Sequence, residues 1–326
     1  MDVRQLRHRL EYVVFCAAVF VIQSLPLRTA ERVTDVLAIL IHRLPSKINR
    51  RQVAEDNIRK SCGDLTEAQT DRMILGMWQH LCRMVFEITH IRRRLRLETT
   101  PVILDFFQRE ECVQAVLSGR KLIFLGGHFG NWEISVNTFG CFGFPMGVIA
   151  RDLDNPWLHK WFLKYRESSG NWIISKRGGG SDLVNSLETC GMASLLCDQD
   201  AGGRGIFVRF FGRPASTFKS IALLALEYDA LIIVGGGRRL PRSKTTRTNW
   251  VPFELATQAI IDSRDFDGSN AMQELTQTYT TALENLVRRS PEQYFWVHRR
   301  WKSEPRRRRR HPVESGAHPA VTDRAS

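Results

Sequence analysis

The segment KLIFLGGHFGNWE, residues 121–133, sets the expectation for the whole of this 326-residue chain. The apolar run from Leu122 to Leu125 has no polar alternation, which is typical of a strand in a sheet that helices cover on both faces. Two glycines end the run, so the backbone can turn sharply and hold His128 at the end of the strand. A helix is expected to begin near Asn131. The segment therefore predicts a strand, a turn that carries a histidine, and a helix.

His128 and Glu133 form a candidate acid–base pair in this segment. They are five positions apart, about 140° on an ideal helix, so they can meet only if the histidine precedes the helix and the glutamate lies in its first turns. The carboxylate would then accept from one ring nitrogen and leave the other free as a base. A structural turn histidine and a phosphate-binding turn are the alternatives. No metal site is expected, because HExxH and a second His or Cys at ligand spacing are absent.

Further apolar runs alternate with helical patterns from about residue 100 onward, at 146–150, 171–175, 192–197, 206–211 and 231–234. This alternation predicts an α/β fold with a mixed, mostly parallel sheet flanked by helices. Ligands on such sheets bind at the carboxyl ends of the strands. Polar side chains follow four of the runs, and we expect them to meet there: His128, Arg151, Arg177, Asp198 and Asp200.

The two aspartates of the segment Cys197–Asp200 would point to opposite sides if the strand continued through them. We therefore expect one to face the site and the other to cap a turn. Arg177 precedes three glycines, a pattern typical of an anion-binding loop or of a flexible one. Arg213 begins a turn in which Ser216 or Thr217 is expected to cap the next helix.

The chain carries a formal net charge of +13, which predicts an acidic partner, either anionic lipid or nucleic acid. Aromatic and basic residues interleave at 294–302, which suits a membrane interface or stacking on nucleic acid equally. The seven cysteines include no CxxC pair, so a reducing compartment is expected rather than a disulfide framework.

The N-terminal segment combines three arginines with an apolar stretch from Tyr12 to Leu27, sixteen residues long. A span needs about 18 to 20 apolar residues, so the stretch either crosses the bilayer or lies in its interface. The following segment, Thr29 to Leu44, has one apolar helical face, typical of an interfacial helix. A signal peptide and a helix pair packed on the domain are the alternatives. Thr66 and Gln69 then predict a capping box at the start of a long helix.

These features predict three parts: a membrane-associated helical region at 1–97, a catalytic domain at 98–303 and a basic, unfolded tail at 304–326. Several blocks resemble, in the same order, the bacterial lipid A biosynthesis acyltransferases of the lauroyl or myristoyl type, whose signature is His, four residues, then Asp or Glu. The blocks are GGHFGNWE (126–133), ARDLDNP (150–156), KRGGG (176–180), LLCDQDAGGRGIFVRFFGRPAST (195–217) and PEQYFWVHRRWK (291–302).

The resemblance implies a glycerolipid acyltransferase-like fold at the cytoplasmic side of the inner membrane. It implies transfer of an acyl group from an acyl carrier protein or coenzyme A thioester, used as a substrate with no further cofactor, to a hydroxyl of an anionic glycolipid such as a lipid A precursor. His128 would be the base and Glu133 its orienting acid, with the substrate held by Arg151, Arg177, Asn131, Asp198, Asp200 and Arg213. Backbone N–H groups near Gly130 and Asn131 are expected to hold the oxyanion.

Three alternatives stay open at this point. The same site could transfer the acyl group to a different glycolipid or a lysolipid, or to water as a hydrolase. The third is a non-enzymatic protein, either a basic one that binds membranes or nucleic acid or a membrane-anchored structural one, although a lipid partner is expected rather than nucleic acid. Ser216 is not a candidate nucleophile, because the G-x-S-x-G turn is missing.

Overall fold

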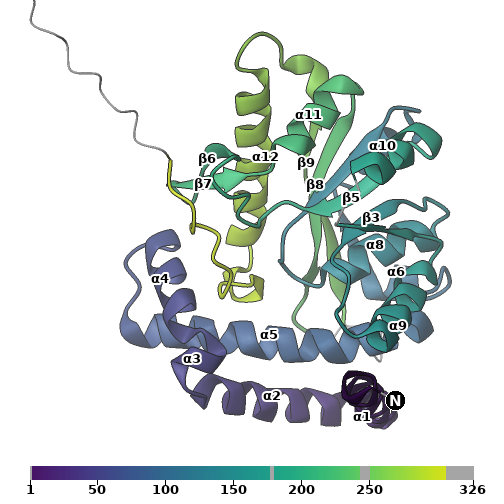
Figure 1. Ribbon diagram of the computed structural model, residues 1–326, viewed down its shortest axis with the longest axis vertical. Helices are drawn as coiled ribbons and strands as arrows, with labels where there is room; N and C mark the ends of the chain where they lie inside the picture. Colours follow the sequence, from purple (N-terminus) through teal and green to yellow (C-terminus); the bar gives the residue numbers. More distant parts are fainter. Residues whose placement is uncertain (1, 177–179, 243–249, 306–326) are drawn as a thin grey trace, which may run out of the picture.

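The computed structural model describes residues 2–176, 180–242 and 250–305. A twisted sheet carries helices on both faces, and a layer of N-terminal helices lies across one end of it (Figure 1). The sheet has seven strands in the order β1-β9-β8-β2-β5-β3-β4. Their bounds are β1 (Leu104–Phe107), β2 (Leu122–Gly126), β3 (Gly147–Ala150), β4 (Trp172–Ser175), β5 (Met192–Leu196), β8 (Leu231–Arg239) and β9 (Phe253–Asp262).

Five of these strands run in one direction, namely β2, β3, β4, β5 and β8. β9 returns antiparallel to β8, and the edge strand β1 runs parallel to β9. The predicted mixed, mostly parallel sheet is confirmed. β2 lies between β8 and β5, and Leu122, Ile123, Phe124 and Leu125 are all buried, as their unbroken apolar run predicted.

Helices follow the strands along the chain and cover the sheet. They are α7 (Arg109–Leu117), α8 (Trp132–Cys141), α9 (Pro156–Glu167), α10 (Gly180–Thr189), α11 (Lys219–Glu227) and α12 (Ala271–Arg288). The side-chain oxygen of Asn131 accepts a hydrogen bond from the Ile134 N–H at 3.3 Å, so α8 begins where the sequence predicted. Because the parallel strands share one direction, the loops after β2, β3, β4 and β5 meet at one edge of the sheet.

Strand β6 (Ile206–Phe210) forms where an apolar run predicted a strand, but it lies outside the main sheet. It pairs antiparallel with β7 (Arg213–Thr217) in a hairpin beside α12 (Figure 1). The predicted helix caps were wrong, because Ser216 and Thr217 belong to β7 and α11 begins later, at Lys219. Two short 3₁₀ helices complete the domain, η1 (Ser263–Asp265) and η2 (Pro291–Gln293).

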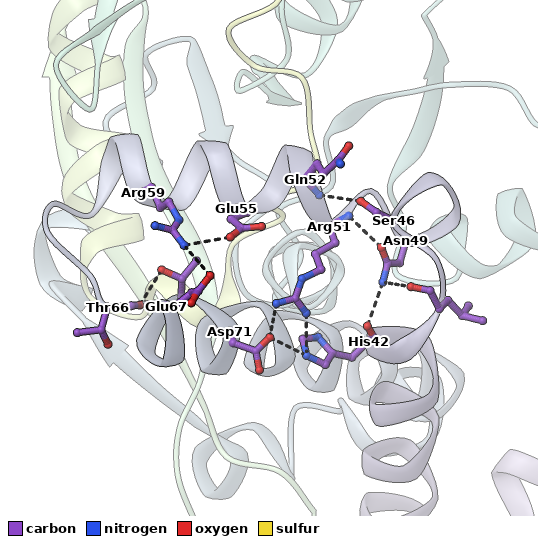
Figure 2. Close-up of polar contacts among 12 residues, drawn as sticks. His42, Ser46, Asn49, Arg51, Gln52, Glu55, Arg59, Thr66, Glu67 and Asp71 are labelled. Atoms are coloured by element: carbon purple, nitrogen blue, oxygen red, sulfur yellow. Dashed lines mark hydrogen bonds and ion pairs between the residues drawn. The ribbon is translucent and has the colours of Figure 1, made fainter.

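The N-terminal layer consists of α1 (Val3–Ser24), α2 (Leu27–Arg43), α3 (Ser46–Asn49), α4 (Arg51–Ser61) and α5 (Glu67–Arg94), and α6 (Thr100–Ile103) leads into β1. The predicted capping box of Thr66 and Gln69 is present at the start of α5. Figure 2 shows the polar contacts that hold the turn after α2. There the Asn49 amide donates to three carbonyls at the end of α2, and Arg51 donates to Asp71 of α5 at 2.5 Å. The position of α2 on α5 is therefore fixed at this end.

The apolar face that the sequence predicted for α2 points away from α5. Ala30, Thr34 and Ala38 are the buried residues of this helix. Five large apolar side chains of the predicted face, four in α2 and one at its C-cap, are 42–57% exposed: Val33, Val36, Leu37, Leu40 and Leu44. Small residues thus make the contact with the domain, and the bulky ones are left at the surface. Within the described ranges, no helix combines the length and the apolar character that a membrane crossing requires.

Candidate active site

The turn after β2 brings His128 to the carboxyl edge of the sheet. Gly130 has a φ of +56°, and a Cβ atom there would lie 2.2 Å from the carbonyl oxygen of Gly237, so only glycine fits. The peptide N–H of Gly130 donates to the Gln293 carbonyl at 2.9 Å, and that of Asn131 donates to the Gly237 carbonyl at 2.7 Å. The turn is therefore pinned to β8 and to the C-terminal segment.

These two hydrogen bonds overturn the predicted oxyanion donors. The N–H groups of Gly130 and Asn131 are already committed to backbone carbonyls and point into the protein. The Asn131 side chain is fully buried and donates to Glu87 of α5 at 2.9 Å. Asn131 therefore holds the start of α8 in place, and the prediction that it touches the substrate was wrong.

Asp198, directly after the neighbouring strand β5, is the acid that binds His128. Its Oδ1 accepts from the imidazole Nδ1 at 2.8 Å, and its Oδ2 accepts from the His128 peptide N–H at 2.7 Å. Only 1% of the Asp198 side chain is exposed. A proton on Nδ1 leaves Nε2 without one, so the buried carboxylate selects the tautomer in which Nε2 is a base.

The expected bond between His128 and Glu133 is not formed. The Glu133 carboxylate instead accepts from Arg166 of α9, with Nη2 at 2.7 Å from Oε1 and Nε at 3.3 Å from both oxygens. Residue 133 lies inside the first turn of α8, and its side chain reaches across to α9. The carboxylate that pairs with His128 therefore comes from Asp198, after the adjacent strand, and not from Glu133.

Burial and charge oppose each other in the His128–Asp198 pair. Burial lowers the pKa of His128, but the charge of Asp198 and the hydrogen bond to it raise that pKa more, to above its ordinary value of 6.5. Burial also raises the pKa of Asp198, and the charge and hydrogen bonds of His128 outweigh it, so that this pKa lies well below 3.8. Asp198 is thus ionised at neutral pH, and it makes His128 a stronger base.

Three aromatic side chains surround the His128 ring. The centroids of His298, Trp132 and Phe295 lie 4.9, 5.2 and 6.1 Å from it. Burial lowers the pKa of His298, and the nearby His128 lowers it further. His298 was not among the predicted site residues, although the block at 291–302 drew attention to its segment. The segment that carries His298 is held beside His128 by the Phe295 N–H, which donates to the His128 carbonyl at 2.9 Å.

A cavity of about 960 Å³ opens beside the His128 ring. Its titratable wall residues are His128, Glu133, Arg151, Arg166, Lys176 and His298. Three permanent cations therefore face one carboxylate, so the cavity favours an anionic ligand. Arg151 lies at the predicted edge of the sheet, after β3, with an exposed side chain.

A narrow apolar slot of about 60 Å³ runs between α8 and the sheet. Among its wall residues are Phe106, Phe124, Phe139, Met146, Ile233 and Leu255. Trp132, Val136, Ser194 and Leu196 line both the slot and the larger cavity. The slot and the cavity therefore lie side by side and share these four residues as a common wall.

Two of the predicted substrate-binding residues lie elsewhere. Asp200 accepts from the Gly202 N–H at 3.2 Å and from the Ser303 hydroxyl at 2.9 Å, so it holds a turn while Asp198 faces the site, as the alternation predicted. Arg213 stacks on Trp301 at 4.1 Å and lies outside the cavity wall. Arg177 falls outside the described residues.

Comparison with known proteins agrees with the ordered blocks. The family described as "Bacterial lipid A biosynthesis acyltransferase" matches residues 2–303. The chain is 27% identical over 188 residues to a lipid A biosynthesis lauroyltransferase of Escherichia coli (57% of this chain, 58% of the relative). It is 24% identical over 195 residues to a lipid A biosynthesis palmitoleoyltransferase of the same organism (59% of each).

A second kind of relative carries a different glycolipid in its name. The chain is 27% identical over 137 residues to a phosphatidylinositol mannoside acyltransferase of Mycolicibacterium smegmatis (40% of this chain, 44% of the relative). The matched regions cover about half of each of these relatives. All three names describe the transfer of acyl groups.

Proposed function

The chain belongs to the bacterial lipid A biosynthesis acyltransferase family, and from this we propose that it is an acyltransferase. It would move a fatty acyl group from a thioester donor to a hydroxyl of an anionic glycolipid. A lipid A precursor is the proposed acceptor, since relatives of that kind match the longest stretches of the chain. Acyl carrier protein or coenzyme A would carry the acyl group.

The single observation that carries the proposal is the pairing of His128 with Asp198. The carboxylate accepts from Nδ1 at 2.8 Å and leaves Nε2 beside a cavity of about 960 Å³. This is the arrangement of a general base that a buried acid orients. A histidine at the edge of a cavity whose pKa a buried carboxylate raises is typical of a catalytic site, and this favours an enzyme over a binding protein.

In the proposed reaction, Nε2 of His128 takes the proton of the acceptor hydroxyl while its oxygen attacks the thioester carbon. The new C–O bond forms, the tetrahedral intermediate collapses, and the C–S bond breaks. The imidazolium, stabilised by Asp198, returns the proton to the leaving thiolate. The products are an ester on the lipid and a free thiol, and no covalent acyl-enzyme is required.

The cavity walls support this choice of substrates. The apolar slot between α8 and the sheet would take the last methylenes of the acyl chain, because burial stabilises each methylene by about 0.8 kcal/mol. Arg151 and Lys176 at the rim would bind phosphate groups of the acceptor or of the donor's phosphopantetheine arm. Arg166 stays paired with Glu133 and would extend this cationic wall.

We further propose that the protein works at the cytoplasmic face of the inner membrane. Supporting this, α1 and α2 leave large apolar side chains at the surface, such as Phe20 at 72% and Val36 at 57% exposure. α1 also packs on α9, where the ring centroids of Phe15 and Trp161 lie 4.9 Å apart. α9 in turn contributes Phe162 and Arg166 to the cavity wall. A lipid acceptor could thus reach the cavity from the same surface.

The test is a transfer assay with the full chain in detergent micelles. Acyl carrier protein and coenzyme A thioesters serve as donors, and a lipid A precursor, a phosphatidylinositol mannoside and water compete as acceptors. Mass spectrometry should show an acylated lipid that His128→Ala reduces by several orders of magnitude, with vesicle binding of the variant unchanged. Release of free fatty acid alone would indicate a hydrolase, and near-normal activity of His128→Ala would refute the mechanism.

A further inference from the structure

A second cavity, of about 500 Å³, lies between α2, α5 and the segment after β8. None of its wall residues lines the cavity beside His128. Its charged wall residues are Arg28, Glu31, Arg32, Asp35, Arg83, Glu87, Arg239 and Arg242. Five arginines therefore face three carboxylates, and the mechanism proposed above uses none of them.

Ion pairs account for only part of this positive charge. Arg83 donates to both oxygens of Asp35 at 2.7 and 2.9 Å, and Arg239 donates to Glu87 at 2.5 and 2.8 Å. Arg242 lies 3.9 Å from Glu31, at the limit of an ion pair. Among the described residues, Arg28 and Arg32 have no carboxylate within that distance. Two positive charges at the cavity are thus available to a ligand.

The first turn of α2 lies at the same wall. α2 is 17 residues long, and its cap residue Pro26 makes no side-chain hydrogen bond to the helix. The N–H groups of the first turn have no acceptor within the helix, and they carry the positive end of its dipole. Leu27 and Arg28 of this turn line the cavity. The Nε atom of Arg83 is also buried without a hydrogen-bond partner in the described part of the chain.

We infer that this cavity binds a phosphate group. Guanidinium groups and helix N–H groups together suit a compact dianion with several oxygen acceptors. Phe86, Leu240 and Val251 form an apolar part of the cavity wall beside the charged residues. Arg32 also lies next to Val33, on the exposed apolar face of α2. The phosphate is carried by an anionic lipid headgroup or is free in solution, and the experiment below separates these two sources.

The wall of this cavity also touches the catalytic turn. Glu87 accepts from Arg239 and from the Asn131 amide, the latter at 2.9 Å. His80 of α5 lies between Arg239 and the Gly130 carbonyl. The Nδ1 atom of His80 is 2.6 Å from Nη1 of Arg239, and its Nε2 atom is 3.1 Å from the Gly130 oxygen. Glu87 and Arg239 are therefore structural, and only the unpaired arginines are suitable for mutation.

The test compares Arg28→Gln/Arg32→Gln with Arg109→Gln/Arg204→Gln, an equal change of net charge at exposed arginines outside the cavity. Calorimetric titration of the full chain with inorganic pyrophosphate should show binding that the first variant weakens at least about tenfold and the second leaves within about twofold. Circular dichroism and Tm should match the wild type for both variants, because the replaced side chains are exposed.

Sedimentation with phosphatidylcholine vesicles, with and without phosphatidylglycerol, identifies the source. A lipid phosphate is indicated if Arg28→Gln/Arg32→Gln weakens binding to the anionic vesicles more than the control variant does. A free phosphate is indicated if only pyrophosphate binding is lost. The inference is overturned if Arg28→Gln/Arg32→Gln binds both ligands like the wild type, or if both variants lose affinity equally, which would mean a general effect of net charge.

Discussion

Replacing Asp198 by asparagine tests the central pairing with a minimal change of shape. The carboxylate accepts two hydrogen bonds from His128, one from the ring at 2.8 Å and one from the peptide N–H at 2.7 Å. An amide has one acceptor oxygen, so it can satisfy only one of these donors. If the amide NH₂ group faces Nδ1, the ring proton moves to Nε2 and the base is lost.

The expected loss follows from the two interactions that disappear. A hydrogen bond to a charged partner contributes about 1.5–3 kcal/mol, and the attraction between the buried carboxylate and the imidazolium adds a similar amount. Together, about 3–6 kcal/mol of transition-state stabilisation corresponds to a fall in kcat of roughly 10²- to 10⁴-fold. KM should change little, since Asp198 does not line the cavity.

The pH profile gives an independent reading of the same variant. His128 must be unprotonated to act as a base, so the wild-type rate should fall as the pH drops through its raised pKa, above 6.5. In Asp198→Asn, burial still lowers the pKa of His128 and the opposing carboxylate is gone, so the acidic limb should move to a lower pH. The assay is steady-state acyl transfer from pH 5 to 9, with Tm as a check of folding.

Glu133→Gln is the matched control for this experiment. Glu133 pairs with Arg166 at 2.7 Å, so its loss should disturb substrate binding and raise KM, with kcat reduced less than about tenfold. A larger fall in kcat for Glu133→Gln than for Asp198→Asn would refute the reasoning and restore the pairing that the sequence alone suggested.

Four further variants test other parts of the structure. Val136→Phe, at the border of the cavity and the slot, should block the end of the path and favour donors about two methylenes shorter, by about tenfold in kcat/KM. Val36→Asp/Leu40→Asp on α2 should weaken vesicle flotation at least about tenfold while leaving Tm unchanged, because both side chains are exposed. The rings of His128 and His298 lie 4.9 Å apart, so His298→Arg should place a permanent cation beside the base. The acidic limb of the rate profile should then move down by roughly one pH unit, whereas His298→Gln should leave it in place.

Local patterns in the sequence predicted the elements that depend on neighbouring residues. The run Leu122 to Leu125 became the central strand, Asn131 caps α8, and Thr66 caps α5. No pattern in the sequence predicted β9, whose residues include Glu254, Thr257 and Gln258. A strand that returns antiparallel at the side of a sheet carries such polar residues without the unbroken apolar run of a central strand.

The partner of His128 could not be found by spacing along the chain. Glu133 is five residues away and Asp198 is seventy, yet the register of β2 against β5 pairs Gly126 with Leu196 and so brings the two following turns together. The sequence placed Asp198 at the carboxyl edge of the sheet, but it did not say that β5 is the neighbour of β2. Strand order is set by how the helices pack on both faces, and single-residue patterns do not carry it.

Arg166 neutralises the second carboxylate in the wall of the cavity beside the base. Glu133 shares a cavity wall with His128, and an unpaired negative charge there would raise the pKa of the imidazole beyond the effect of Asp198. A histidine with too high a pKa is protonated at neutral pH and cannot take a proton from a hydroxyl. Arg166 cancels that charge with a contact of 2.7 Å, so one carboxylate orients the base and the other leaves its basicity intact.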